Sequence, residues 1–285
     1  MTMTDEQVTR PDFSVVGHTE ADDASTHLSQ ARTIELLLEG SERPNRTVPI
    51  RRSFLQLSKP SGSKVPGALR SLVANRQERA LDLYLLVAAV THKPDYEVTT
   101  WSSTWARSIG IFDEKTGAAA VSRAWKTLKN LGLISTARGK GRQTTVTKRL
   151  EDGSGNYTPP GKRNEPYLQL PFEYWDHDLH LNLSLPGKAL YLIALANHMP
   201  PRDTRFPLVH TRIAQHYGLA ERTVANGIKD LITHGVLEQK GVQRYATLAV
   251  RNGWATRPLY EICAPFSRRG PAPTPTVWAE DFSEL

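Results

Sequence analysis

The chain contains two copies of one sequence pattern, and this repeat limits its fold more than any other feature. Three segments of the first copy recur in the same order in the second: LYLLVAAV (83–90) as LYLIALAN (190–197), WARSIGI (105–111) as IAQHYGL (213–219), and VSRAWKTLKNLGLI (121–134) as VANGIKDLITHGVL (224–237). The spacing changes by five residues between the second and third segments, where a turn is expected and insertions are tolerated. Repeated segments in one order indicate two copies of one domain.

The third segment of the first copy has the periodicity of a helix with one buried face. Its apolar residues recur at i, i+3, i+4 and i+7, and they are Val121, Ala124, Trp125, Leu128 and Leu131. Ser122, Arg123 and Lys126 then point away from the core, near the N-terminal half of the helix. Gly132 ends the helix, and a Thr-rich, β-prone stretch predicts a hairpin after it. Each copy is thus expected to form a helix, a short helix, a turn, a longer helix and a hairpin, beginning in the first copy with a helix over 71–90.

Positive charge is concentrated in one contiguous third of the chain. The overall net charge of +7 hides this pattern. Residues 43–79 contain nine basic residues and one acidic residue, and residues 80–150 contain eleven and five, so the net charges are +8 and +6. Residues 1–42 contain two and nine, a net charge of −7, and residues 151–285 contain fourteen of each. A strong positive field over one region indicates a protein that binds a polyanion.

The order of elements in each copy resembles the winged helix-turn-helix, a DNA-binding module. The resemblance covers about residues 71–149 and 166–250, and its most specific parts are the second and third repeated segments. It implies that the third helix enters a DNA groove, where outward side chains contact base edges: Ser122, Arg123 and Lys126 in the first copy. It also implies that the hairpin is a wing whose basic tip contacts phosphates: Arg138, Lys140 and Arg142.

The second copy offers a weaker DNA-binding surface. Its third helix has polar groups suited to DNA, namely Arg222, Thr223, Asn226 and Lys229. Its predicted wing, 238–250, contains only Lys240 and Arg244 as basic residues, and the whole segment is neutral. DNA binding and a protein-binding or dimerisation role are therefore both open for this copy. Its opening, YLQLPFEYW through LSLPGKALY, resembles winged-helix domains of plasmid and phage replication initiators.

Other functional classes lack their sequence signatures. There is no G-x-x-x-x-G-K-[ST] phosphate loop and no G-x-S-x-G nucleophile elbow, so we expect no enzyme activity and no cofactor. The single cysteine, Cys263, excludes an intrachain disulfide and suits a reducing cytosol. His177 and His180 lie beside Asp176 and Asp178, but a polar loop explains this cluster better than a metal site. No apolar run approaches the ~18 residues of a membrane span, and we expect a cytoplasmic, nucleoid-associated protein.

These observations predict an α+β, mostly helical chain with two winged helix-turn-helix domains between a disordered N-terminal segment and a Pro-rich C-terminal segment. The predicted parts are an acidic tail (1–42), a basic arm or linker (43–70), the first domain (71–149), a linker (150–165), the second domain (166–263) and a Pro-rich tail with an acidic aromatic end (264–285).

The predicted function is sequence-specific binding of double-stranded DNA by a bacterial or mobile-element transcriptional regulator. A plasmid or phage replication initiator that binds origin repeats is the first alternative, and a protein-binding adaptor is the second. Double-stranded DNA is the expected partner. A homodimer through the second domain and a protein bound at the C-terminal tail are further candidates.

Overall fold

The computed structural model describes residues 28–59, 61–91, 95–139, 141, 143–161, 166–198 and 204–267. Most of the predicted acidic tail lies outside the described residues, as does most of the Pro-rich tail with its acidic aromatic end. Lys140 and Arg142 of the predicted wing tip also lie outside them.

The first copy folds as a helix, a strand, two further helices and a hairpin. Its elements are α3 (Glu78–Val90), β4 (Glu97–Thr100), α4 (Ser102–Ser108), α5 (Glu114–Asn130), β5 (Ile134–Arg138) and β6 (Thr144–Lys148). The three strands form an antiparallel sheet in the order β4-β6-β5. The predicted stripe on α5 is buried at Val121, Ala124, Trp125 and Leu128. Trp125 packs edge-on against Trp105 of α4, with ring centroids 5.4 Å apart.

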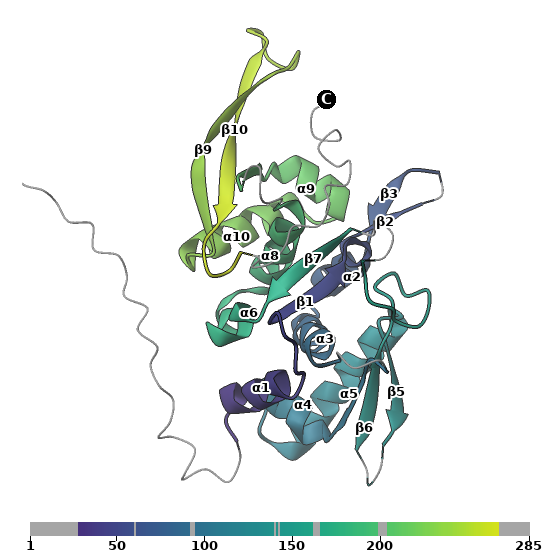
Figure 1. Ribbon diagram of the computed structural model, residues 1–285. Helices are drawn as coiled ribbons and strands as arrows, with labels where there is room; N and C mark the ends of the chain where they lie inside the picture. Colours follow the sequence, from purple (N-terminus) through teal and green to yellow (C-terminus); the bar gives the residue numbers. More distant parts are fainter. Residues whose placement is uncertain are drawn as a thin grey trace, which may run out of the picture.

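The second copy repeats this arrangement. Its elements are α8 (Leu185–Asn197), β8 (Phe206–Pro207), α9 (His210–Tyr217), α10 (Glu221–Thr233), β9 (Leu237–Ala246) and β10 (Trp254–Ile262). Its strands form an antiparallel sheet in the matching order β8-β10-β9. The sequence repeat is therefore a repeat of one fold, and the predicted α+β class with two winged-helix-like units is confirmed (Figure 1).

The segment predicted as a basic arm or linker, 43–70, contains ordered elements. These are β1 (Thr47–Arg51), the 3-10 helix η1 (Arg52–Phe54), β2 (Gln56–Ser58), β3 (Lys64–Pro66) and the start of α2 (Ala68–Ala74). Strand β1 pairs antiparallel with β7 (Tyr167–Pro171), from Thr47 opposite Pro171 to Arg51 opposite Tyr167. Figure 1 shows this two-stranded sheet in the middle of the molecule, between the two units.

Three short helices complete the described chain. They are α1 (Gln30–Glu39), α6 (Glu173–Asp176) and α7 (Leu179–Asn182). Helix α1 lies within the segment predicted as an acidic tail, and it packs on the first unit. Its Gln30 Nε2 donates to the Ser108 carbonyl at the end of α4, at 3.1 Å.

The single helix predicted over 71–90 is wrong, because the chain turns between α2 and α3. Arg76 has a φ of 52°, a left-handed conformation that an α-helix does not continue through. The Gln77 N–H donates to the Leu72 carbonyl at 2.8 Å and closes the turn. The segment between the helices contains neither Pro nor Gly, so the break has no strong local signal in the sequence.

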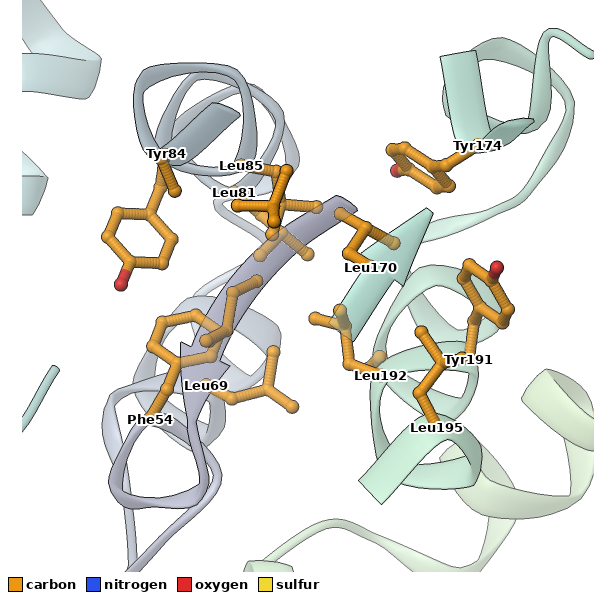
Figure 2. Close-up of a cluster of buried hydrophobic side chains, with 14 of the residues drawn as sticks. Phe54, Leu69, Leu81, Tyr84, Leu85, Leu170, Tyr174, Tyr191, Leu192 and Leu195 are labelled. Carbon is orange, nitrogen blue, oxygen red and sulfur yellow. The ribbon is translucent and has the colours of Figure 1, made fainter. Parts of the chain in front are cut away.

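One hydrophobic core runs through both units. Figure 2 shows its buried side chains gathered around β1 and β7: Phe54, Leu69, Leu81, Tyr84 and Leu85 from the first half of the chain, and Leu170, Tyr174, Tyr191, Leu192 and Leu195 from the second. Burying one such side chain contributes about 1.5–3 kcal/mol, so separating the units would expose a large apolar surface. The shared core therefore fixes the position of the first unit relative to the second.

One buried lysine with two acidic partners adds to this contact. Lys188 of α8 is 2% exposed, and its Nζ lies 2.9 Å from Glu78 Oε1 and 2.8 Å from Asp82 Oδ1, both on α3. Burial raises the pKa of Asp82 to about 6, although Lys188 opposes the shift. A buried ammonium is costly without its counter-charges, so this pairing favours one placement of α8 on α3.

His180 of α7 is a pH-sensitive group in the same core. Burial, together with the positive charge of Lys188, lowers the pKa of His180 from 6.5 to about 4. The folded state therefore binds fewer protons at this ring than the unfolded state does between pH 6.5 and pH 4. Stability contributed by the neutral ring is lost as the pH falls through that window. His177, by contrast, is exposed, and its ring packs edge-on against Phe266.

We expect the wild-type protein to lose about 3 kcal/mol more stability than His180→Gln between pH 6.5 and pH 4, because glutamine does not titrate. Urea unfolding of both proteins at several pH values measures the difference. Comparison with the variant cancels the contribution of Asp82, whose raised pKa acts in the opposite direction over part of the window. If the free energy of unfolding of the wild type and that of His180→Gln change in parallel with pH, His180 is not a buried, neutral histidine.

Candidate nucleic-acid interface

Helix α5 presents the first predicted reading surface. Ser122, Arg123 and Lys126 are all exposed, on the side away from the buried stripe. Their predicted position near the N-terminal half of the helix is wrong, because α5 begins at Glu114 and ends at Asn130. Ser122 lies at the middle of the helix, and Arg123 and Lys126 lie in its C-terminal half.

The N-terminal half of α5 exposes residues that apolar periodicity alone does not identify. The helix begins early because the Asp113 carboxylate accepts a hydrogen bond from the Thr116 N–H at 3.0 Å, as an N-cap side chain does. This hydrogen bond also lowers the pKa of Asp113. The exposed residues of the first two turns are Glu114, Lys115, Thr116, Ala118 and Ala119. Asp followed by Glu before an Ala-rich run is a helix-start signal that could have located them.

The hairpin β5–β6 carries the first predicted wing. Arg138 is exposed at the end of β5, opposite Thr144 of β6. The Gly139 N–H donates to the Gln143 carbonyl at 2.8 Å and closes the turn between the strands. Lys140 and Arg142 belong to this turn but are outside the described residues. Because β5 follows α5 directly, Arg138 lies on the element next to the helix that carries the first predicted reading surface.

Helix α10 presents the second predicted reading surface. Arg222 is its second residue and is exposed, as are Asn226 and Lys229, whereas Thr223 is half-buried. The opposite side of the helix is buried at Val224, Gly227, Ile228 and Leu231. Arg222, Thr223 and Asn226 therefore lie in the N-terminal half of this helix, the part that contacts base edges in helix-turn-helix proteins.

The second hairpin, β9–β10, is longer and more basic than predicted. The expected wing, 238–250, does not include the return strand, which adds Arg257, or the end of the turn, which adds Arg251. The hairpin spans Leu237–Ile262, and its basic residues are Lys240, Arg244, Arg251 and Arg257. Lys240 Nζ lies 2.7 Å from Glu238 Oε2, at the end of the hairpin nearest the core.

Several arginines of the predicted basic arm are used inside the fold. Arg43 donates from Nε to the Ala89 carbonyl at 2.6 Å and from Nη2 to the Ala88 carbonyl at 2.8 Å, so it caps the end of α3. Arg46 pairs with Asp176 at 2.7 Å, and Arg51 is buried. The positive charge counted in residues 43–79 is thus only partly at the surface. Its exposed members are Arg46, which is paired with Asp176, and Lys59, Lys64, Arg70, Arg76 and Arg79.

Within the described ranges, no group of three or more His, Cys, Asp or Glu side chains is placed to hold a metal ion. In the part of the chain that the structure describes, every helix is too short or too polar to cross a membrane.

Comparison with known proteins shows a distant likeness to solved structures. No family model matches the chain, and no curated protein matches its sequence. Among solved structures, it is similar to a chain described as "Crystal structure of Pi initiator protein in complex with iteron DNA". The two share 11% sequence identity and a TM-score of 0.42, over 78% of this chain and 99% of that one. At this distance the function of that protein does not transfer to this chain.

Proposed function

We propose that the chain is a non-enzymatic protein that binds double-stranded DNA in a sequence-specific manner through its two winged-helix-like units. One observation, repeated in both units, supports this most strongly. The third helix buries one side in the core and exposes basic or amide side chains on the other. A hairpin with an exposed arginine, Arg138 or Arg244, follows directly.

The exposed groups suit readout of base pairs. A guanidinium, such as that of Arg123 or Arg222, can donate two hydrogen bonds to guanine O6 and N7. The Asn226 amide can bond in the same bidentate way to adenine. Lys126, Lys229 and Arg138 can contact phosphates, which adds affinity without sequence information.

The shared core gives the two reading helices a constant separation. Strand β1 pairs with β7, and Lys188 joins α8 to α3, so the units do not move independently. We therefore propose a DNA site with two parts at one fixed spacing.

For the biological role we propose a transcriptional regulator of a bacterium or mobile element. The sites of a regulator lie in promoters, whereas those of a replication initiator form tandem repeats at an origin. Mapping the bound sites in the cell distinguishes these roles. A protein-binding adaptor would show no salt-dependent affinity for DNA.

The wing predicts a defined salt dependence. Replacing Arg138, Lys140 and Arg142 together by alanine should weaken binding to every duplex, because phosphate contacts carry no sequence information. The slope of log affinity against log salt should fall by about 2.7, at ~0.9 per lost contact. Fluorescence anisotropy with specific and random duplexes measures both effects. Arg32→Ala, on α1, is the control. A slope equal to that of the wild type would contradict the wing assignment.

A further inference from the structure

The β9–β10 hairpin is a long ribbon that stands away from the rest of the molecule. Nearly all of β9 beyond Leu237 is exposed, and the strand contacts the core only at its start. Strand β10 returns to the core at Tyr260 and Ile262. The free part, Gln239–Ala246 and its partner strand, extends for about 26 Å at ~3.3 Å per residue. Figure 1 shows the ribbon projecting beyond both units.

The end of the ribbon exposes apolar side chains to water. In the tip turn, 247–253, Leu248 is 102% exposed and Val250 is 39% exposed. The turn has defined geometry: the Thr247 N–H donates to the Gly253 carbonyl at 2.9 Å, and the Gly253 N–H donates to the Val250 carbonyl at 3.0 Å. Apolar groups gathered at the end of a protruding, ordered ribbon indicate a surface that contacts a partner.

Both faces of the ribbon carry a guanidinium held against an aromatic ring. The Arg244 guanidinium lies 4.5 Å from the ring centroid of Trp254, and Arg257 lies 5.1 Å from that of Tyr245. The strand register places these two pairs on opposite faces, because Arg244 is opposite Thr256 whereas Tyr245 is opposite Ala255. Contact with an aromatic face holds each arginine in place before any partner binds.

Charge is separated along the ribbon. Glu238 and Glu261 lie opposite each other near the core, and Lys240 neutralises the first of them. From residue 239 to residue 260 the sequence contains four basic residues and no acidic ones. The outer part of the ribbon is therefore positive on both faces, and its tip exposes Leu248 and Val250 beside Arg251.

We propose that this ribbon enters the minor groove of duplex DNA, that Leu248 and Val250 wedge between base pairs, and that the duplex bends as a result. A groove is lined by one phosphate row on each side, which matches a ribbon with one arginine on each face. Apolar side chains that enter the minor groove part stacked bases and kink the duplex. The inference rests on the proposed DNA binding and adds a second activity, distortion of the bound site.

The experiment compares wild-type protein with Leu248→Ser/Val250→Ser on a short duplex selected for binding, with fluorescent dyes at its two ends. Energy transfer between the dyes should report a wild-type bend of about 20–90°. The double variant should lose more than half of that bend. Its Kd should rise by less than about tenfold, because phosphate contacts supply most of the affinity. Leu181→Ser, at an apolar residue of α7 that is 51% exposed, is the matched control and should bend DNA as the wild type does.

The possible results distinguish a failure of the wedge proposal from a failure of the proposed DNA binding. An unchanged bend in the double variant would overturn the wedge. A wild-type protein that binds the duplex without bending it would overturn the wedge alone. A wild-type protein that binds no duplex would overturn the proposed function as well. A fluorescent adenine analogue in the bent step should brighten with wild-type protein and stay dim with the double variant.

Discussion

Replacing Glu151 by alanine should lower the free energy of unfolding by about 3–5 kcal/mol. The Glu151 side chain is 0% exposed, and its two carboxylate oxygens each lie 3.0 Å from a buried cation, Arg51 Nη1 and Lys148 Nζ. Burial lowers the pKa of Lys148 to about 8, and Glu151 opposes this shift. Without the carboxylate, two cations remain buried with no counter-charge at this position, a state that is much less stable than the intact cluster.

The loss of stability should involve more than the Glu151 side chain, because the cluster joins three parts of the chain. Arg51 ends β1, Lys148 ends β6 of the first wing, and Glu151 follows the first unit. Chemical denaturation of the wild type and the variant measures the loss. Glu238→Ala, which removes an exposed partner of Lys240, should leave the midpoint almost unchanged because solvent screens that pair. A Glu151→Ala variant as stable as the Glu238→Ala control would contradict the buried cluster.

Replacing Arg123 and Arg222 together by alanine should cost about 2–6 kcal/mol at the specific DNA site, at about 1–3 kcal/mol for each lost base contact. The two residues lie on different helices, α5 and α10, so their effects should add. Binding to random duplex should weaken far less, since base contacts contribute little there. Titrations of the wild type, both single variants and the double variant give the four affinities needed.

Arg32→Ala is the control for this cycle, because Arg32 is a half-buried arginine on α1 that is paired with Glu35. Its affinity for both duplexes should equal that of the wild type. An equal loss on specific and random DNA would show that Arg123 and Arg222 contact only phosphates. If one of the two single variants binds the specific duplex as tightly as the wild type, the arginine replaced in that variant does not contact the bases.

The repeat and the outward faces of the third helices could be predicted from the sequence, because apolar periodicity is a local property. Val121 and Val224 occupy corresponding positions in the two copies, and both are buried. The same periodicity does not locate the start of α5, since the first two turns of this helix contain small or polar residues and show no apolar period. A capping residue, Asp113, was the signal there.

The structure of the predicted arm, residues 43–70, could not be predicted from its own sequence. Thr47 pairs with Pro171, and no pattern within either segment identifies so distant a partner. Composition treats Arg43 and Arg51 as free positive charge, whereas the fold uses one as a helix cap and buries the other beside Glu151. The second hairpin did have a local signal, because Asn252-Gly253 is typical of a turn before a return strand.

Selection from a random duplex library with the full-length protein tests the central claim most directly. Sequence-specific binding by two rigidly joined units predicts strong enrichment of one motif in two parts, separated by a constant number of base pairs. A retained pool with no more sequence bias than the starting library would contradict sequence-specific recognition, and a protein that retains no duplex at all would contradict DNA binding itself.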